Sequence, residues 1–135
     1  MAIIWNDNLI TGISIIDEQH QVLFETINKL GKAKEDKGCF YEVLIDLQTY
    51  VSVHFNTEEK YMRYTGYPEF ETHKACHDKF VKDYKNILKK FAKFDNIMDI
   101  GPELITFVED WLIEHYNNED VKMATYLNKN SLNDV

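Results

Sequence analysis

The sequence contains five histidines, and each of them lies among apolar residues that recur with the period of a helix. They are His20, His54, His73, His77 and His115. His73 and His77 are four residues apart, as are His54 and Glu58, so each pair projects from one face of a helix. Buried imidazoles and carboxylates lose their hydration, and a metal ion is a partner that several of them can share. These residue types at this spacing predict a buried metal site.

A second candidate carboxylate, Asp120, does not share a helix face with its nearest histidine. It follows His115 by five residues, and such a step turns a regular helix by about 500°. If both side chains bind one centre, the helix must loosen or end between them, and Asn117 and Asn118 are compatible with that. Glu59 falls on the outer face of its segment, so we assign Glu58 and not Glu59 to the site.

Four amphipathic segments that would position these residues are predicted to be helices. They run from about Asp17 to Lys34, from Phe40 to Tyr64, from Glu69 to Lys93, and onward from Gly101. Short polar links between them favour an all-α fold, an antiparallel up-down four-helix bundle. The first sixteen residues lack a clean period and are expected to form an N-terminal arm anchored by Trp5. The tail after Asp120 has room for one or two more helical turns.

The ends of these helices are predicted from residues with strong positional preferences. Asp17 suits the N-cap of the first helix, and Gly38 lies where that helix is expected to stop. Gly66, followed by Pro68, is expected to end the second helix. Pro102 is placed in the first turn of the fourth.

Composition narrows the class of protein. With 44% hydrophobic and 28% charged residues, the 135-residue chain is predicted to be one globular domain over residues 1–135. A net charge of -8 argues against nucleic-acid partners and against an anionic membrane surface. No apolar run reaches the roughly 18 residues of a membrane helix, and the N-terminus does not look like a signal peptide. Two cysteines, Cys39 and Cys76, are interpreted as reduced thiols, so a cytoplasmic protein is expected.

The order of the motifs resembles the hemerythrin family, and most of all its bacterial members. One His in the first segment is followed by His-x3-Glu, His-x3-His and His-x4-Asp in the next three. Neighbouring stretches match as well, such as Asp17-Glu18-Gln19-His20 and Gly66-Tyr67-Pro68. The resemblance implies two iron ions with an oxo or hydroxo bridge. It assigns His73, His77 and His115 to one iron, His20 and His54 to the other, and Glu58 and Asp120 to both.

The same resemblance implies a function. Five imidazoles supply five bonds, the two bridging carboxylates supply four, and the bridging oxygen supplies two, which makes eleven. Two octahedral ions have twelve positions, so one position stays open on the iron held by His20 and His54. Dioxygen is expected to bind there as the pair passes from Fe2+ to Fe3+, and to leave again. By family analogy the oxygen pocket is lined by Leu23, Phe55, Trp111, Leu112 and Tyr116. Tyr116 stands where the family usually has isoleucine, and its hydroxyl either approaches the open position or turns to solvent.

Reversible dioxygen binding for transport, storage or buffering is therefore the expected function, and the chain is not expected to be an enzyme. Ferritin-like di-iron oxidases use Glu-x-x-His motifs, and the sequence contains none. Two alternatives stay open. One is an oxygen or redox sensor, and the other is a di-iron enzyme such as an oxidase or a nitric oxide reductase.

Overall fold

The computed structural model describes residues 10–33, 36–94 and 97–130, and these residues form helices without strands. The long helices are α1 (Ser14–Lys32), α2 (Lys37–Thr65), α3 (Phe70–Phe94) and α4 (Ile97–His115). A π-helix, Tyr116–Asp120, joins α4 to the shorter α5 (Val121–Lys129). The predicted all-α four-helix bundle is confirmed. Trp5 and the rest of the expected N-terminal arm up to residue 9 lie outside the described residues.

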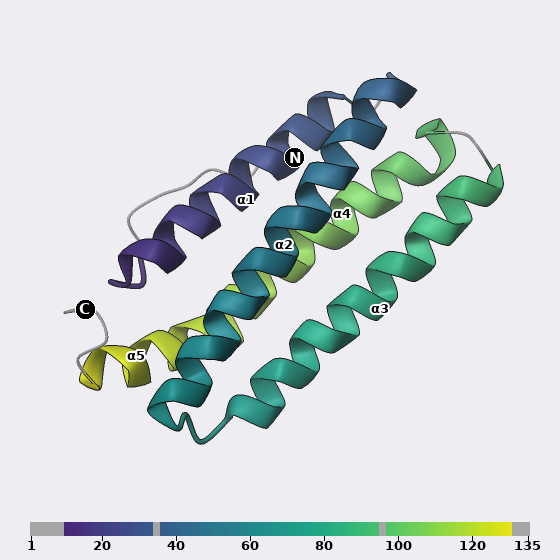
Figure 1. Ribbon diagram of the computed structural model, residues 1–135. Coiled ribbons are helices and arrows are strands. Elements are labelled where there is room, and N and C mark those ends of the chain that lie inside the picture. Colours follow the sequence, from purple (N-terminus) through teal and green to yellow (C-terminus); the bar gives the residue numbers. More distant parts are fainter. Residues whose placement is uncertain (1–9, 34–35, 95–96, 131–135) are drawn as a thin grey trace.

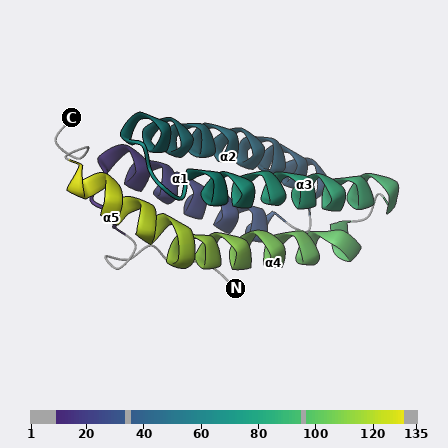
Figure 2. The same ribbon diagram turned by 90° about the horizontal axis from the view of Figure 1, so that it is seen from below.

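The four long helices run alternately up and down beside one another (Figure 1). α1 packs against α2 and α3 against α4, while α1 also contacts α4 and α2 contacts α3. Figure 2 shows their axes nearly parallel, with α5 continuing past the end of α4. Within the described part of the chain, no helix is long and apolar enough to cross a membrane.

Two apolar cores divide the bundle along its length. The larger core includes Leu23, Phe55, Phe80 and Leu112. The smaller core gathers Ile16, Met62, Tyr67, Met123 and Leu127 near α5. On every helix the candidate ligands fall between residues of the two cores, as His20 falls between Ile16 and Leu23. The bundle therefore encloses one polar layer between two apolar ones.

The start of α1 differs from the sequence prediction. α1 begins at Ser14, and the N-cap position belongs to Ile13, which makes no side-chain capping bond. Asp17 lies inside the first turn, where its carboxylate accepts hydrogen bonds from the Thr11 N–H (2.8 Å) and the Thr11 hydroxyl (2.7 Å). A carboxylate is favourable near a helix N-terminus, and here it also holds the chain that leads into the helix.

The link between α1 and α2 also corrects a prediction. Gly38 does not stop α1, which ends at Lys32. Gly38 instead lies in the first turn of α2, because Asp36 forms the N-cap and accepts the Cys39 N–H at 3.1 Å. The short side chain of aspartate suits this position, so the helix begins earlier than its apolar pattern suggests.

α4 also starts before its predicted beginning. It opens at Ile97, so Pro102 lies within the helix and not in its first turn. Proline has no N–H, so the helix loses one backbone hydrogen bond there. The helix continues through Pro102 because the loss affects only one turn near its N-terminus.

α2 ends at Gly66, as the sequence predicts. Gly66 adopts a left-handed backbone with φ of 69°, and the Tyr67 N–H then bonds to the Met62 carbonyl at 2.9 Å. This closes the last turn of the helix and directs the chain into α3.

Replacing Gly66 by alanine should destabilise the protein through its backbone alone. A Cβ at Gly66 would meet no atom within 4 Å, so the cost is the left-handed conformation, about 1 kcal/mol. Gly31 is the matched control, because it also has open space but lies in ordinary helical geometry. We expect Gly31→Ala to raise the free energy of unfolding by about 0.5 kcal/mol, measured by urea denaturation. A Gly66→Ala protein as stable as the parent would contradict this account.

Candidate metal centre

The seven side chains singled out from the sequence lie together in the polar layer. Their ligand atoms form two clusters, and within each cluster they all lie within 4.8 Å of one another. The first cluster contains Glu58, His73, His77 and His115, and the second contains His20, His54, Glu58 and Asp120. Glu58 belongs to both. None of the seven residues is more than 5% exposed.

The spacing of the donor atoms suits six-coordinate ions. Neighbouring ligands of an octahedral ion with bonds of about 2.1 Å stand about 3.0 Å apart. The Nε2 atoms of His20 and His54 are 3.0 Å apart, and Nε2 of His54 is 3.0 Å from Oε2 of Glu58. In the other cluster the Nε2 atoms of His73 and His115 are 3.2 Å apart.

Hydrogen bonds do not account for these contacts. Oε2 of Glu58, Nε2 of His77 and both carboxylate oxygens of Asp120 are buried without a hydrogen bond of good geometry. Buried polar atoms left in this state cost free energy. A cation between them would satisfy all of these atoms at once, so the residues present fit a metal ion.

The two carboxylates also attract positive charge to the layer. Burial lowers the pKa of His20, but Asp120 and Glu58 outweigh it and raise that pKa to about 9. Burial likewise opposes protonation of His73, whose pKa the same carboxylates raise to about 10. Burial tends to raise the pKa of Glu58, yet the neighbouring imidazoles, His54 foremost, hold it well below its usual value. A metal ion would supply this charge in place of the protons.

The π-helix brings His115 and Asp120 onto one face. The Val121 N–H bonds to the Tyr116 carbonyl, five residues back, so each turn holds more residues than in an α-helix. Nε2 of His115 consequently lies 3.1 Å from Oδ1 of Asp120. The helix loosens between the two residues, as their spacing requires.

α5 holds this irregular segment in place from the other side. The Tyr126 hydroxyl donates to the Thr65 carbonyl at 2.7 Å, at the end of α2. The Asn128 amide donates to the Thr11 carbonyl at 2.8 Å, just before α1. These bonds join the ends of three helices, and so fix the direction from which Asp120 approaches the layer.

Two further residues, which the sequence analysis left out of the site, orient its histidines. Glu59 is buried, not on an outer face as predicted, and accepts the Nδ1–H of His77 at 2.9 Å. The amide oxygen of Gln19 accepts the Nδ1–H of His54, also at 2.9 Å. With Nδ1 donating, Nε2 of each ring presents a lone pair toward the cluster. The sequence signal for both residues was their position next to a candidate ligand, since Glu59 follows Glu58 and Gln19 precedes His20.

Apolar side chains cover one side of the centre. Four members of the predicted oxygen pocket, Leu23, Phe55, Trp111 and Leu112, line a single cavity of about 10 Å³, close to the smallest that holds a water-sized molecule. Phe55 stacks on His77 with ring centroids 3.8 Å apart, and Trp111 stacks on His115 at 4.3 Å. The cavity therefore lies directly against histidines of the layer.

Tyr116 occupies a different place from the other four pocket residues. The residue is buried, and its ring centroid lies 5.8 Å from that of His20. It is not among the residues that line the cavity. Burial raises the pKa of the Tyr116 phenol, and the charges of Asp17 and Asp120 add to that effect. The hydroxyl therefore stays protonated at neutral pH.

Comparison with known proteins gives a consistent result. The model of the family described as the hemerythrin HHE cation binding domain matches residues 11–127. A bacteriohemerythrin of Pseudomonas aeruginosa is 34% identical over 120 residues, which are 87% of this chain and 76% of the relative. One from Methylococcus capsulatus is 34% identical over 115 residues, covering 82% of this chain and 84% of the relative.

Solved structures agree with the sequence comparison. The crystal structure of a hemerythrin variant with one leucine replaced by alanine superposes with a TM-score of 0.82 at 30% identity. The match covers 94% of this chain and 98% of that structure. Family model, relatives and structures all span the helices that carry the seven buried ligands, and the chain belongs to the hemerythrin family.

Proposed function

We propose that the chain binds dioxygen reversibly at two iron ions inside the bundle, and so carries, stores or buffers dioxygen. The observation that carries this proposal is the convergence of seven buried ligands in two clusters that share Glu58. The apolar cavity against the same layer supports it, because a small apolar molecule has a place beside the metal. Membership of the hemerythrin family supports iron as the metal.

The ligands would divide between the two ions according to their clusters. His73, His77 and His115 would hold one iron, and His20 and His54 the other. Glu58 and Asp120 would bridge the pair, together with an oxo or hydroxo group. Glu58 belongs to both clusters, and Asp120 reaches both because its Oδ2 lies 3.3 Å from Nε2 of His20 and its Oδ1 3.1 Å from Nε2 of His115. Two ferrous ions would supply the two electrons that dioxygen takes up on binding and returns on leaving.

The protein's own residues favour reversible binding over oxidation. Five neutral imidazoles and two carboxylates place less negative charge on the metal than the carboxylate-rich sites of ferritin-like oxidases. Such a site stabilises high oxidation states of iron less. The apolar lining keeps water and protons away from the bound gas, so dioxygen is able to leave unchanged.

Glu59 and Gln19 keep the site ready for metal. Each accepts a hydrogen bond from Nδ1 of a histidine, the ring nitrogen that points away from the cluster. This bond fixes the tautomer and the orientation of the ring. Gln19 is itself held, since its amide nitrogen donates to the Thr57 hydroxyl at 3.0 Å. We propose that these two residues position His77 and His54.

The direct test is an oxygen titration. The iron-loaded protein is reduced without oxygen, exposed to dioxygen in steps, and followed by its visible spectrum. We expect two irons per chain and a colour that disappears when the gas is removed. Steady consumption of dioxygen with an added electron donor, without reversible colour, would indicate an enzyme instead.

Loss of Glu58 should remove iron more severely than loss of a single histidine. Glu58→Ala takes a ligand from both clusters and leaves positive charge uncompensated in the buried layer. His54→Ala takes one neutral ligand from one cluster and should retain more iron. The matched control is Glu42→Ala, which changes an exposed glutamate of the same helix and should keep both irons.

Iron content by elemental analysis and melting temperature by circular dichroism measure this effect. Loss of iron, by chelation or by Glu58→Ala, should lower the melting temperature by roughly 10 °C or more. Full iron content in Glu58→Ala would show that the bridging assignment is wrong.

Tyr116 should determine how quickly the oxygenated protein decays to the ferric form. That decay consumes protons, and we propose that the phenol of Tyr116, whose ring lies beside His20 and whose raised pKa keeps it protonated, donates one. Tyr116→Phe keeps the ring and removes the donor, so we expect slower decay of the oxygenated spectrum at fixed pH. A rate equal to the parent's, or faster, would show that the hydroxyl has no part in it.

A further inference from the structure

Dioxygen has to cross a layer of side chains to reach the centre. The ligand residues are at most 5% exposed, and the cavity beside them is lined by apolar side chains. The rate of binding therefore depends on which side chains separate this cavity from solvent.

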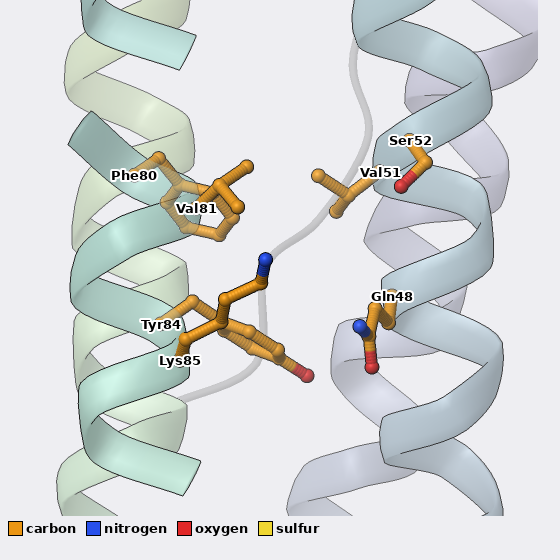
Figure 3. A pocket seen from close by; sticks show the side chains of 7 residues that line it. All are labelled: Gln48, Val51, Ser52, Phe80, Val81, Tyr84 and Lys85. Carbon is orange, nitrogen blue, oxygen red and sulfur yellow. The ribbon is translucent and has the colours of Figure 1, made fainter. Parts of the chain in front are cut away.

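A groove lies between α2 and α3, and side chains of both helices line it (Figure 3). It has a volume of about 110 Å³. Gln48, Ser52 and Lys85 form a polar rim, while Val51 and Phe80 lie deeper and are at most 9% exposed. Val51 and Phe80 also line the inner cavity. The groove and the cavity therefore adjoin at these two residues.

We propose that dioxygen enters and leaves the protein through this groove, passing between Val51 and Phe80. This inference rests on the proposed function, because it concerns the same centre. Dioxygen is apolar, so a path lined by valine and phenylalanine accepts it while excluding ions and hydrogen-bonded water.

Phe80 is not branched at Cβ, so we take it as the side of the gate that moves. Val51 is branched at Cβ, and a helical valine has one strongly preferred rotamer. Phe80 packs against other aromatic rings, with Trp111 at 4.4 Å and Phe55 at 5.8 Å between centroids. A shift of the Phe80 ring therefore opens the groove toward the side chains that stack on the histidines.

A second groove offers a contrast. It lies over α1 and α2, is larger at about 230 Å³, and is lined in part by Val22, Tyr50 and Val53. It shares no lining residue with the inner cavity. Gln19, the partner of His54, lies at this groove, but the groove does not adjoin the inner cavity. The exposed Val53 therefore provides a control on the same helix as Val51.

The first experiment measures association and dissociation rates of dioxygen by rapid mixing. Val51→Phe adds bulk at the gate and should slow both rates about tenfold, equivalent to about 1.4 kcal/mol of barrier. Val51→Ala should speed both rates. Val53→Phe, the same substitution in the other groove, should leave both rates at the parent value. Equal slowing by Val53→Phe, or parent rates in both Val51 variants, would overturn the proposal.

A second measurement does not depend on reversible binding. Dissolved dioxygen is paramagnetic and speeds the relaxation of methyl protons that it meets, so the oxidised protein is examined by NMR under dioxygen pressure. Methyl groups of Leu23 and Leu47, which line the inner cavity, should relax faster than those of Ile16 and Leu127, which are equally buried in the smaller core. Because Val51 lines this cavity, Val51→Phe should also fill part of it and reduce this difference.

The two measurements separate the route from the function. Faster relaxation at Leu23 and Leu47 without reversible oxygenation would contradict the proposed function and support the route. Reversible oxygenation with equal relaxation in both cores would contradict the route and leave the function standing.

Discussion

The structure depends on one electrostatic constraint, which is that two carboxylates and five imidazoles are buried in a single layer of an apolar bundle. Carboxylates removed from water need positive charge nearby, and no lysine or arginine is among the buried residues of the described part of the chain. Without metal, the layer meets this need by holding protons on histidines, as the raised pKa values of His20 and His73 indicate. Metal ions meet the same need and also satisfy the buried atoms that hydrogen bonds leave unpaired.

The rest of the bundle is arranged so that all the ligands of this layer lie at the same level along the bundle axis. Apolar cores on both sides keep water out, and the helices cross the layer at the positions of their ligands. Three helices reach it with regular geometry. The fourth does so only because it widens into a π-helix, which α5 holds in place by its bonds to Thr65 and Thr11.

The two clusters are not equivalent, and the difference lies in the residues behind the histidines. The outer nitrogen of His77 donates to a carboxylate, Glu59, while that of His54 donates to an amide, Gln19. A carboxylate partner makes an imidazole more basic than an amide does. The cluster of three histidines therefore offers a stronger donor to its ion, while the His20 and His54 side carries the neighbouring phenol of Tyr116.

The sequence by itself determined the helices and the candidate ligands, because the apolar period and the four-residue spacings are local properties of a helix. It also indicated that the chain must loosen between His115 and Asp120, since five residues do not fit one face of a regular turn. Only the tertiary structure decided that Glu59 and Gln19 support the histidines and that Tyr116 is buried beside His20. It likewise decided that Asp17 accepts hydrogen bonds from Thr11 and that Val51 and Phe80 line both a groove and the cavity. These features depend on how neighbouring helices are rotated against each other, and the periodicity of one helix does not contain that rotation.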